Sequence, residues 1–343
     1  MLGVKNSIES ENNMDMLDKN YSIGIDIGGT KCAVVLGKGV LNFNSKEGFI
    51  IEKTTFLTKE AGSWEDVVQK LIVAIAEIWN KYDMKASEVV GIGISCGGPL
   101  DHKRGIIMNP PNLSGWNNVP IVDLIKEKFS VPVYLENDAN ACAVAEWRFG
   151  VARGKKNVIF LTFGTGMGAG LILDNKLYHG TNNMAGEIGH VRLSRLGPVG
   201  YGKAGSFEGF CSGGGIVQIA QNRLLEELQQ GRQKEVDYWR VQKEITTESL
   251  AIAAKQGDLF ALSVFDVSAE YLGKGLSILI DILNPEIIIV GSVYERCRDL
   301  FYDRMHEVLK KESLANSYGV CEITAASLGD EVGDYAALAV AFG

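Results

Sequence analysis

Apolar runs bounded by glycine turns alternate with helical patterns along most of this chain. Residues 21–27 and 32–37 are mostly apolar and flank a Gly-Gly turn, which predicts two strands joined by a tight turn. Residues 63–82 place apolar side chains three or four positions apart after Ser63, as in an amphipathic helix with a serine cap. Further strands, each an apolar run ending at turn residues, are predicted at 89–95, 131–135, 157–163 and 286–290. Strands that alternate with helices in this way indicate an α/β fold.

A second glycine-rich turn, LTFGTGMGAG at 161–170, follows the same plan as the first. Its glycines have the spacing of a dinucleotide-binding fingerprint, but 171–178 has the pattern of a strand turning into another strand, where that fingerprint requires a helix. The first turn likewise differs from a Walker A loop, because Thr30 and Lys31 lead into a strand. Both segments are strand, glycine turn and strand, which is the arrangement expected from an old duplication.

Between the two turns lies the stretch Glu-Asn-Asp-Ala-Asn at 136–140, at the end of a strand and the beginning of a helix. Asp138 is compatible with two roles there: an N-cap of the helix, or a base that takes a proton from an attacking hydroxyl. Ligands of open α/β sheets bind beyond the carboxyl ends of the strands. The position therefore favours the functional interpretation.

Length and composition limit the kinds of protein that this chain can be. A chain of 343 residues exceeds the usual size of one core, which predicts two domains with the chemistry in a cleft between them. Its 46% hydrophobic and 22% charged residues are typical of a soluble globular protein. The net charge of −8 disfavours sequence-independent binding to nucleic acid, so no nucleic-acid partner is expected.

The cysteines and the apolar runs indicate in which cellular compartment the protein is expected. The six cysteines are scattered singly, without the spacing of a disulfide framework or a zinc site, and are predicted to be reduced thiols. Residues 1–20 are polar and lack the apolar core of a signal peptide, so we expect a flexible leader and a cytoplasmic protein. Polar residues from Asp281 to Glu286 interrupt the apolar run at 275–293, which excludes a membrane-spanning helix there.

Two loops offer candidate ligand groups. Backbone N–H groups of the first glycine turn can approach phosphate, and Asp26 can hold Mg²⁺ directly or through water; the alternative is a plain hairpin. In the loop at 109–116, Asn112 and Trp116 are available to a sugar, although a simple surface loop is the alternative.

Five motifs occur in an order that resembles one known family. They are IDIGGTK at 25–31, Pro-Asn-Leu-Ser-Gly-Trp at 111–116, Glu-Asn-Asp-Ala-Asn at 136–140, the glycine turn at 164–170 and Gly-Glu-Ile-Gly-His at 186–190. From Ile23 onward the chain resembles the ROK family (repressors, open reading frames, kinases), within the sugar kinase, actin and heat-shock chaperone superfamily. The resemblance implies an α/β fold of two ribonuclease H-like lobes with a cleft between them. The N-terminal lobe would be 21–137, joined by a C-terminal helix at 330–343, and the C-terminal lobe 138–329.

The resemblance also implies a role for individual residues. Asp138 matches the catalytic base, and Asp26 matches the acid associated with Mg²⁺, directly or through water. Positions that match contacts to sugar hydroxyls are Gly98, Asn112, Asn137, Glu187, His190 and Glu208. Positions that match contacts to ATP are Gly28, Gly29, Thr30, Lys31, Thr165 and Gly166, with Gly291 at the adenosine segment.

The sequence departs from the family in its zinc segment. Counting back from Glu208, the family's Cys-x-Cys-Gly-x-x-Gly-Cys falls on Val199, Tyr201 and Ser206, none of them cysteine. Structural zinc takes four Cys or His ligands, so we expect no zinc. The loop is instead expected to be held by packing through Tyr201 and Phe207.

The function predicted from these features is an ATP-dependent sugar kinase of the glucokinase type. It would transfer the γ-phosphoryl of ATP to a hexose hydroxyl, the 6-hydroxyl of glucose or of a related aldohexose or N-acylamino sugar, and resemblance implies a homodimer. Alternatives are a sugar-sensing repressor, which would add a DNA-binding helix-turn-helix before the first phosphate segment, and a sugar-binding pseudokinase. Only about twenty residues precede Tyr21, which disfavours the repressor.

Overall fold

The computed structural model describes residues 21–38 and 49–343. The predicted flexible leader, residues 1–20, lies outside the described residues. Two compact units divide the chain: the first ends at Arg153 and resumes with Leu328–Gly343, and the second is Gly154–Ser327. The boundary expected after residue 137 therefore moves to Arg153. The reason is helix α5 (Asp138–Arg148), which packs on the C-terminal helix α13 (Val332–Val340) within the first unit.

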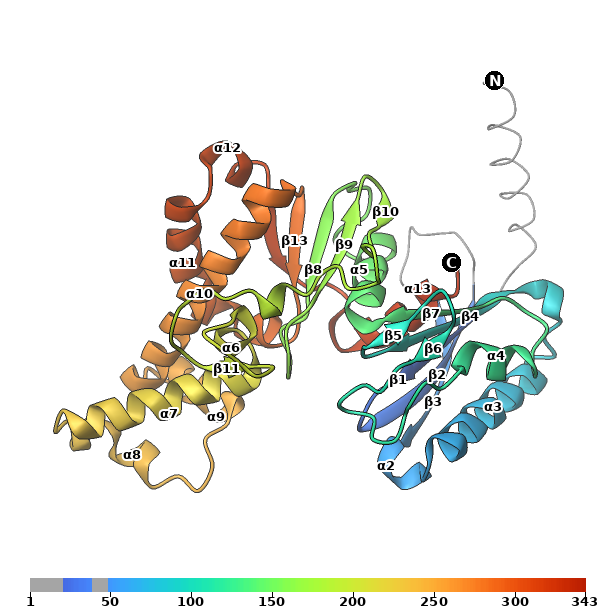
Figure 1. Ribbon diagram of the computed structural model, residues 1–343, viewed down its shortest axis with the longest axis horizontal. Coiled ribbons are helices and arrows are strands. Elements are labelled where there is room, and N and C mark those ends of the chain that lie inside the picture. Colours follow the sequence, from blue (N-terminus) through green and yellow to red (C-terminus); the bar gives the residue numbers. More distant parts are fainter. Residues whose placement is uncertain (1–20, 39–48) are drawn as a thin grey trace. The chain divides into compact units, whose positions relative to one another are not determined.

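The first unit is built on a mixed sheet with the strand order β3-β2-β1-β4-β7 (Figure 1). The strands are β1 (Tyr21–Ile27), β2 (Lys31–Lys38), β3 (Ile50–Leu57), β4 (Val89–Cys96) and β7 (Val133–Asn137). The first three pair antiparallel, whereas β4 runs parallel to β1 and β7 runs parallel to β4. The predicted strand, glycine turn and strand at the beginning of the chain is thus confirmed as β1 and β2.

The second unit repeats this plan with the strand order β10-β9-β8-β13-β14. The strands are β8 (Val158–Leu161), β9 (Ala169–Leu173), β10 (Lys176–Leu177), β13 (Ile287–Val290) and β14 (Glu322–Ala325). Antiparallel pairs again join the first three, and β13 and β14 again continue in parallel. The hairpin β8–β9 therefore occupies the place that β1–β2 has in the first unit. This is the α/β fold with a ribonuclease H-like sheet in each unit that the family resemblance implies.

Helix α13 lies directly on the first sheet because glycines leave the strand surface bare beneath it. A side chain at Gly24 of β1 would meet the backbone nitrogen of Leu338 at 2.8 Å, and one at Gly93 of β4 would collide with backbone atoms of Ala337 and Ala341. The helix is mostly apolar, and its residues 335–340 are buried. On the other face, helix α3 (Trp64–Lys81) packs its apolar stripe on the core after a capping box at Ser63, as predicted.

Helices pack on the sheet of the second unit and share its core (Figure 1). They are α6 (Phe207–Phe210), α7 (Gly213–Gln229), α8 (Asp237–Arg240), α9 (Thr247–Lys255), α10 (Leu259–Leu283), α11 (Val293–Glu312) and α12 (Ala315–Tyr318). The long helices α10 and α11 pack against each other, with the rings of Phe265 and Phe301 meeting edge to face at 5.5 Å. In the described part of the chain, we find no helix with the length and apolarity needed to cross a bilayer.

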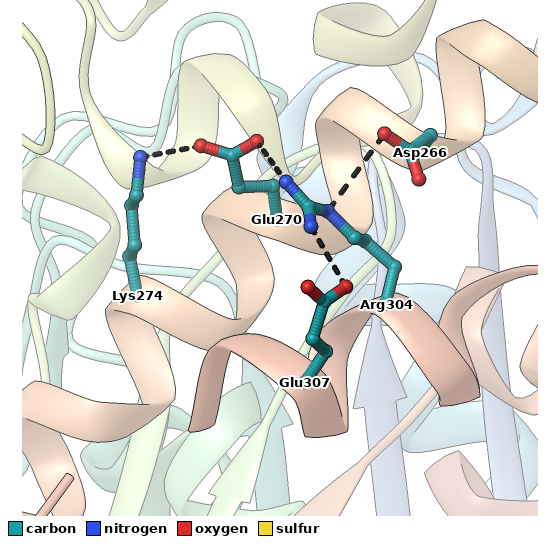
Figure 2. A network of polar contacts seen from close by, with 5 residues as sticks. All are labelled: Asp266, Glu270, Lys274, Arg304 and Glu307. Atoms are coloured by element: carbon teal, nitrogen blue, oxygen red, sulfur yellow. Dashed lines mark hydrogen bonds and ion pairs between the residues drawn. The ribbon is translucent and has the colours of Figure 1, made fainter. Parts of the chain in front are cut away.

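Arg304 of α11 ties the outer surfaces of α10 and α11 together (Figure 2). Its guanidinium donates hydrogen bonds of 2.8 Å to Glu270 and to Glu307, and Asp266 lies 3.8 Å from its Nε. Lys274 holds the other oxygen of Glu270 at 2.6 Å. The two acids that accept from Arg304 raise the pKa of its guanidinium further above the ordinary value. These hydrogen bonds and ion pairs thus link the exposed faces of two helices whose buried faces are apolar.

Candidate active site

The first glycine turn joins β1 to β2 and leaves no room for side chains. Gly28 donates its backbone N–H to the carbonyl of Lys31 at 3.1 Å, and a side chain at Gly29 would lie 2.5 Å from the carbonyl oxygen of Asn112. Thr58 fastens the turn by donating its hydroxyl to Gly28 O at 2.7 Å and its N–H to Thr30 O at 2.9 Å. Thr30 and Lys31 are exposed. The turn therefore presents backbone and two polar side chains to solvent, as a phosphate cradle requires.

The loop at 111–116 is anchored by its apolar residues. Leu113 and Trp116 are 2% and 3% exposed and belong to the core of the first unit. The expectation that Trp116 is available to a ligand is wrong, because its ring is buried among apolar neighbours. Asn112, between the exposed Pro111 and the buried Leu113, stays at the surface. The buried indole thus serves to hold Asn112 in place.

Helix α5 begins at Asp138, and its N-cap is the preceding residue. Asn137 has an extended backbone, and its side-chain oxygen accepts the N–H of Ala139 at 3.0 Å. Glu136 accepts the N–H of Asn137 and the side-chain amide of Asn140, both at 2.9 Å, which fixes the strand end before the helix. Because Asn137 caps the helix, the cap interpretation of Asp138 is not needed.

Three of the predicted sugar-binding residues and the predicted base come together around the end of β4. A side chain at Gly97 would meet the amide of Asn112 at 3.6 Å and the Oδ2 of Asp138 at 3.8 Å. A side chain at Gly98 would meet the Nδ2 of Asn137 at 3.3 Å. The other carboxylate oxygen of Asp138, Oδ1, accepts the N–H of Ala139 at 2.8 Å. The candidate site of the first unit therefore consists of the backbone at Gly97 and Gly98, the side-chain amides of Asn112 and Asn137, and the Oδ2 of Asp138.

Asp138 is accessible to solvent, and the protein around its carboxyl disfavours the charged form. Its side chain is exposed. Desolvation by the surrounding protein raises the pKa of its carboxyl, and the hydrogen bond from Ala139 opposes that rise. An accessible carboxylate with a raised pKa is suited to accept a proton from a bound hydroxyl.

The pKa of Asp26, near the end of β1, is also raised. Burial raises its pKa to about 7, repulsion from Asp138 and Asp334 adds to the rise, and Lys31 and Lys53 oppose it. Three carboxyl groups thus concentrate negative charge at one place in the first unit. A cation there would relieve that repulsion.

Asp334 is a member of this group that the sequence interpretation missed. It is 5% exposed within α13, and Lys53 of β3 donates a hydrogen bond to its Oδ2. A side chain at the neighbouring Gly333 would meet the Oδ2 of Asp26 at 3.3 Å. The available signal was a charged residue inside the otherwise apolar helix VGDYAALAV.

Magnesium fits this acidic group only with help from its substrate. Within residues 21–38 and 49–343, no three His, Cys, Asp or Glu side chains gather closely enough to hold a metal ion. Mg²⁺ commonly takes one or two protein carboxylates and completes its shell with water and substrate phosphates. Asp26, with two like-charged neighbours, fits the role of such a carboxylate.

In the second unit, the glycine turn between β8 and β9 is braced by Glu208. The Oε2 of Glu208 accepts the N–H of Met167 at 3.0 Å, and a side chain at Gly166 would lie 2.9 Å from the same oxygen. Thr165 is exposed at the tip of the turn. The structure therefore brings the predicted phosphate residue Gly166 and the predicted sugar residue Glu208 into contact.

The predicted adenosine segment lies beside the same turn. Gly291 donates its N–H to Leu161 O at 3.0 Å, which places it at the end of β8. A side chain at Gly164 would meet the hydroxyl of Ser292 at 3.7 Å. Ser292 begins α11 with a φ of +53°, a conformation that favours glycine. The turn and the start of α11 thus lie next to each other.

Glu187 and His190 flank a short 3-10 turn. Both side chains are exposed, and His190 donates its N–H to Glu187 O at 3.1 Å. Phe207 is fully buried, as the packing prediction for this loop requires, but Tyr201 is 78% exposed, and its ring centroid lies 6.2 Å from that of His190, edge to face. The expected role of Tyr201 in packing the loop is therefore wrong, since its ring is in solvent.

Comparisons with known proteins show the family of this chain. Residues 22–342 match the sequence model of the ROK family. The chain belongs to the ROK family. A glucokinase of Halalkalibacterium halodurans is 31% identical over 93% of both chains, and a xylose repressor of Caldicellulosiruptor bescii is 30% identical over 91% of this chain and 76% of its own. The solved structure of a ROK family glucokinase from Streptomyces griseus, in complex with glucose and AMPPNP, is 30% identical. It superimposes with a TM-score of 0.70 over 93% of this chain and 98% of its own. Both glucokinases and a xylose repressor are thus similar to this ROK family chain.

Proposed function

We propose that this protein is an ATP-dependent sugar kinase that phosphorylates a hexose hydroxyl. The 6-hydroxyl of glucose, or of a related aldohexose or N-acylamino sugar, is the proposed acceptor. The observation that carries the proposal is the position of the Asp138 Oδ2, beside Gly97 and the Asn112 amide, in a residue that the helix does not need as a cap. The glucokinases of similar sequence and structure support it.

In this proposal Asp138 is the general base. Its carboxylate accepts the proton of the sugar hydroxyl as that oxygen attacks the γ-phosphorus of ATP, and the raised pKa of the carboxyl brings its basicity closer to the working pH. The oxygen–phosphorus bond to ADP breaks as the new bond forms, and the proton ends on Asp138. The groups proposed to bind sugar hydroxyls are Gly98, Asn112, Asn137, Glu187, His190 and Glu208.

The nucleotide is proposed to meet backbone more than side chains. Gly28, Gly29, Thr30, Lys31, Thr165 and Gly166 are the proposed contacts to phosphate, with Gly291 at the adenosine. Bare glycines let backbone N–H groups approach phosphate oxygens, and Lys31 adds a positive charge. Mg²⁺, when bound with ATP, neutralises phosphate charge, and Asp26 is its proposed carboxylate, directly or through water.

A second candidate function is a sugar-responsive regulator without kinase activity. The specific observation in its favour is the 30% identity to a xylose repressor. Such a protein would bind sugar with the same hydroxyl-binding groups, and it would have no need of a base at position 138. The two functions therefore differ in turnover and agree in sugar binding.

The test is release of ADP by the purified protein with ATP, Mg²⁺ and a panel of hexoses, pentoses and amino sugars. We expect sugar-dependent ADP release with at least one aldohexose and a phosphorylated sugar in the product. Xylose serves as a matched probe, because it lacks the 6-hydroxyl of glucose. Saturable sugar binding by calorimetry without any ADP release would contradict the kinase and support the regulator.

A further inference from the structure

The positions that match the family's zinc cysteines offer no zinc ligands in this chain. Val199 is aliphatic, and Tyr201 points its phenol into solvent. Ser206 is fully buried, and its hydroxyl is already used, because it accepts the N–H of Gly209 at 3.1 Å and lies 3.4 Å from Gly200 O as a donor. Structural zinc needs four nitrogen or sulfur ligands, and these residues supply none.

The segment is folded as a short hairpin that needs support from outside. Strands β11 (Val199–Gly200) and β12 (Lys203–Ala204) pair antiparallel through a two-residue turn. Tyr201 and Gly202 at its centre have φ angles of +43° and +74°, the signs of a type I′ turn. A hairpin of two residue pairs is unstable alone in water, and a tyrosine in the left-handed region adds strain.

Gln218 of helix α7 supplies that support. Its side-chain oxygen accepts the N–H of Val199 at 2.8 Å, and its side-chain nitrogen donates to the carbonyl of the same residue at 2.9 Å. The amide therefore satisfies both backbone groups of Val199, as a neighbouring strand would. Arg192 adds a hydrogen bond of 2.9 Å to Ala204 O on the second strand.

The hairpin in turn touches two of the proposed sugar-binding residues. A side chain at Gly200 would lie 2.6 Å from Gly209 N and 2.8 Å from the Cβ of Glu208, so hairpin and α6 pack backbone to backbone. Lys203 donates its Nζ to the carbonyl of His190 at 2.7 Å. A displaced hairpin would therefore move both Glu208 and His190.

We propose that the bidentate amide of Gln218 locks this hairpin without metal and makes Gln218 a positioning residue for Glu208 and His190. The lock depends only on the two hydrogen bonds of Gln218, whereas the positioning role rests on the proposed sugar kinase function. Side-chain hydrogen bonds and glycine packing thus hold the loop at the positions that match the family's zinc cysteines.

Limited digestion with trypsin tests the lock directly, since Lys203 lies in the hairpin and Arg192 and Arg195 lie shortly before it. We expect Gln218→Ala to be cleaved there about tenfold faster than wild type, the change expected from losing two hydrogen bonds. Gln218→Glu should also be cleaved faster, because a carboxylate cannot donate a hydrogen bond to the carbonyl of Val199 and repels its oxygen. Gln221→Ala, on an exposed position of the same helix, is the matched control and should match wild type. EDTA should leave the wild-type rate unchanged.

Steady-state kinetics test the positioning role. In Gln218→Ala we expect the KM for sugar to rise about tenfold, with kcat within about twofold of wild type. Faster cleavage of wild type in EDTA, one bound zinc per chain, or equal cleavage of the Gln218 and Gln221 variants would overturn the lock. Faster cleavage with an unchanged KM for sugar would overturn the positioning role. A wild-type protein without turnover would contradict the proposed function, and the trypsin rates would still decide the lock.

Discussion

Asn137 caps helix α5, so Asp138, the first helical residue, is not required as its cap. One side-chain oxygen of Asn137 accepts the N–H of Ala139, whereas the Oδ2 of Asp138 lies beside Gly97 and Asn112. A carboxylate that a helix does not need, placed next to bare backbone and an amide, is more readily explained by chemistry than by stability.

This division of roles predicts opposite effects on stability. Asn137→Ala removes the cap and should lower the free energy of unfolding by about 1 kcal/mol. Asp138→Asn keeps an acceptor for Ala139 and removes a charge that the surroundings disfavour, so it should change that free energy by less than about 0.5 kcal/mol or raise it. Urea unfolding of both variants at neutral pH measures the difference. An equal loss in the two variants would make Asp138 a structural cap.

Asp26 should make stability fall as pH rises. Its pKa is about 7 in the folded protein against 3.8 for the free group, so the folded state favours the protonated carboxyl. Its contribution is fully present below about pH 4 and is lost as pH rises through about 7. Asp26→Asn should therefore resemble wild type at low pH and exceed it by about 2 to 4 kcal/mol at pH 8.

Unfolding in urea without Mg²⁺, followed across this pH range, measures the Asp26 effect. Asp123→Asn, at an exposed position of helix α4 (Ile121–Lys126), is the control and should show no such growth with pH. A constant difference between Asp26→Asn and wild type across the range would show that the carboxyl has its ordinary pKa.

The contact between α13 and the first sheet depends on Gly93. Its Cβ would collide with the backbone of Ala337 and Ala341, which cannot move without unseating the helix. Gly93→Ala should lower the free energy of unfolding by about 3 kcal/mol. Gly214→Ala is the control, because nothing lies within 4 Å of its Cβ, and it should change stability by less than about 1 kcal/mol. Equal melting temperatures of the two variants would contradict the close packing of α13 on Gly93.

Arg304 should stabilise the pair α10 and α11 through its planar fork. Arg304→Met removes hydrogen bonds to Glu270 and Glu307 and should lower the free energy of unfolding by about 1 kcal/mol, less at about 1 M salt. Arg240→Met, which removes an exposed pair 3.1 Å from Asp237, should have no measurable effect. Equal effects of the two substitutions, or a loss that salt does not reduce, would contradict the network in Figure 2.

Glycines, caps and short apolar runs made much of the fold predictable. The two strand, turn and strand units were visible because glycines interrupt apolar runs at corresponding places, and Ser63 marked the beginning of α3. Helix α11 was not anticipated, since charged residues dominate its sequence. Its signal was the apolar spacing of Tyr294, Phe301 and Met305, which pack into the core.

Single side chains were harder to predict because composition does not say which way a ring points. Trp116 and Tyr201 were assigned the wrong environments: the first is buried and the second is in solvent. Asp334 and Gln218 were missed because each acts through a partner distant in sequence, Lys53 for the first and Val199 for the second. Such pairs are defined by the folded chain.

Turnover by Asp138→Asn tests the central claim most directly. The substitution keeps the shape of the side chain and removes its basicity, so ADP release with ATP, Mg²⁺ and the preferred hexose should fall about a hundredfold or more. Binding of the sugar, measured separately by calorimetry, should stay within about threefold of wild type, because the base acts on the step after binding. Turnover close to wild type in this variant would contradict the assignment of Asp138 as the catalytic base.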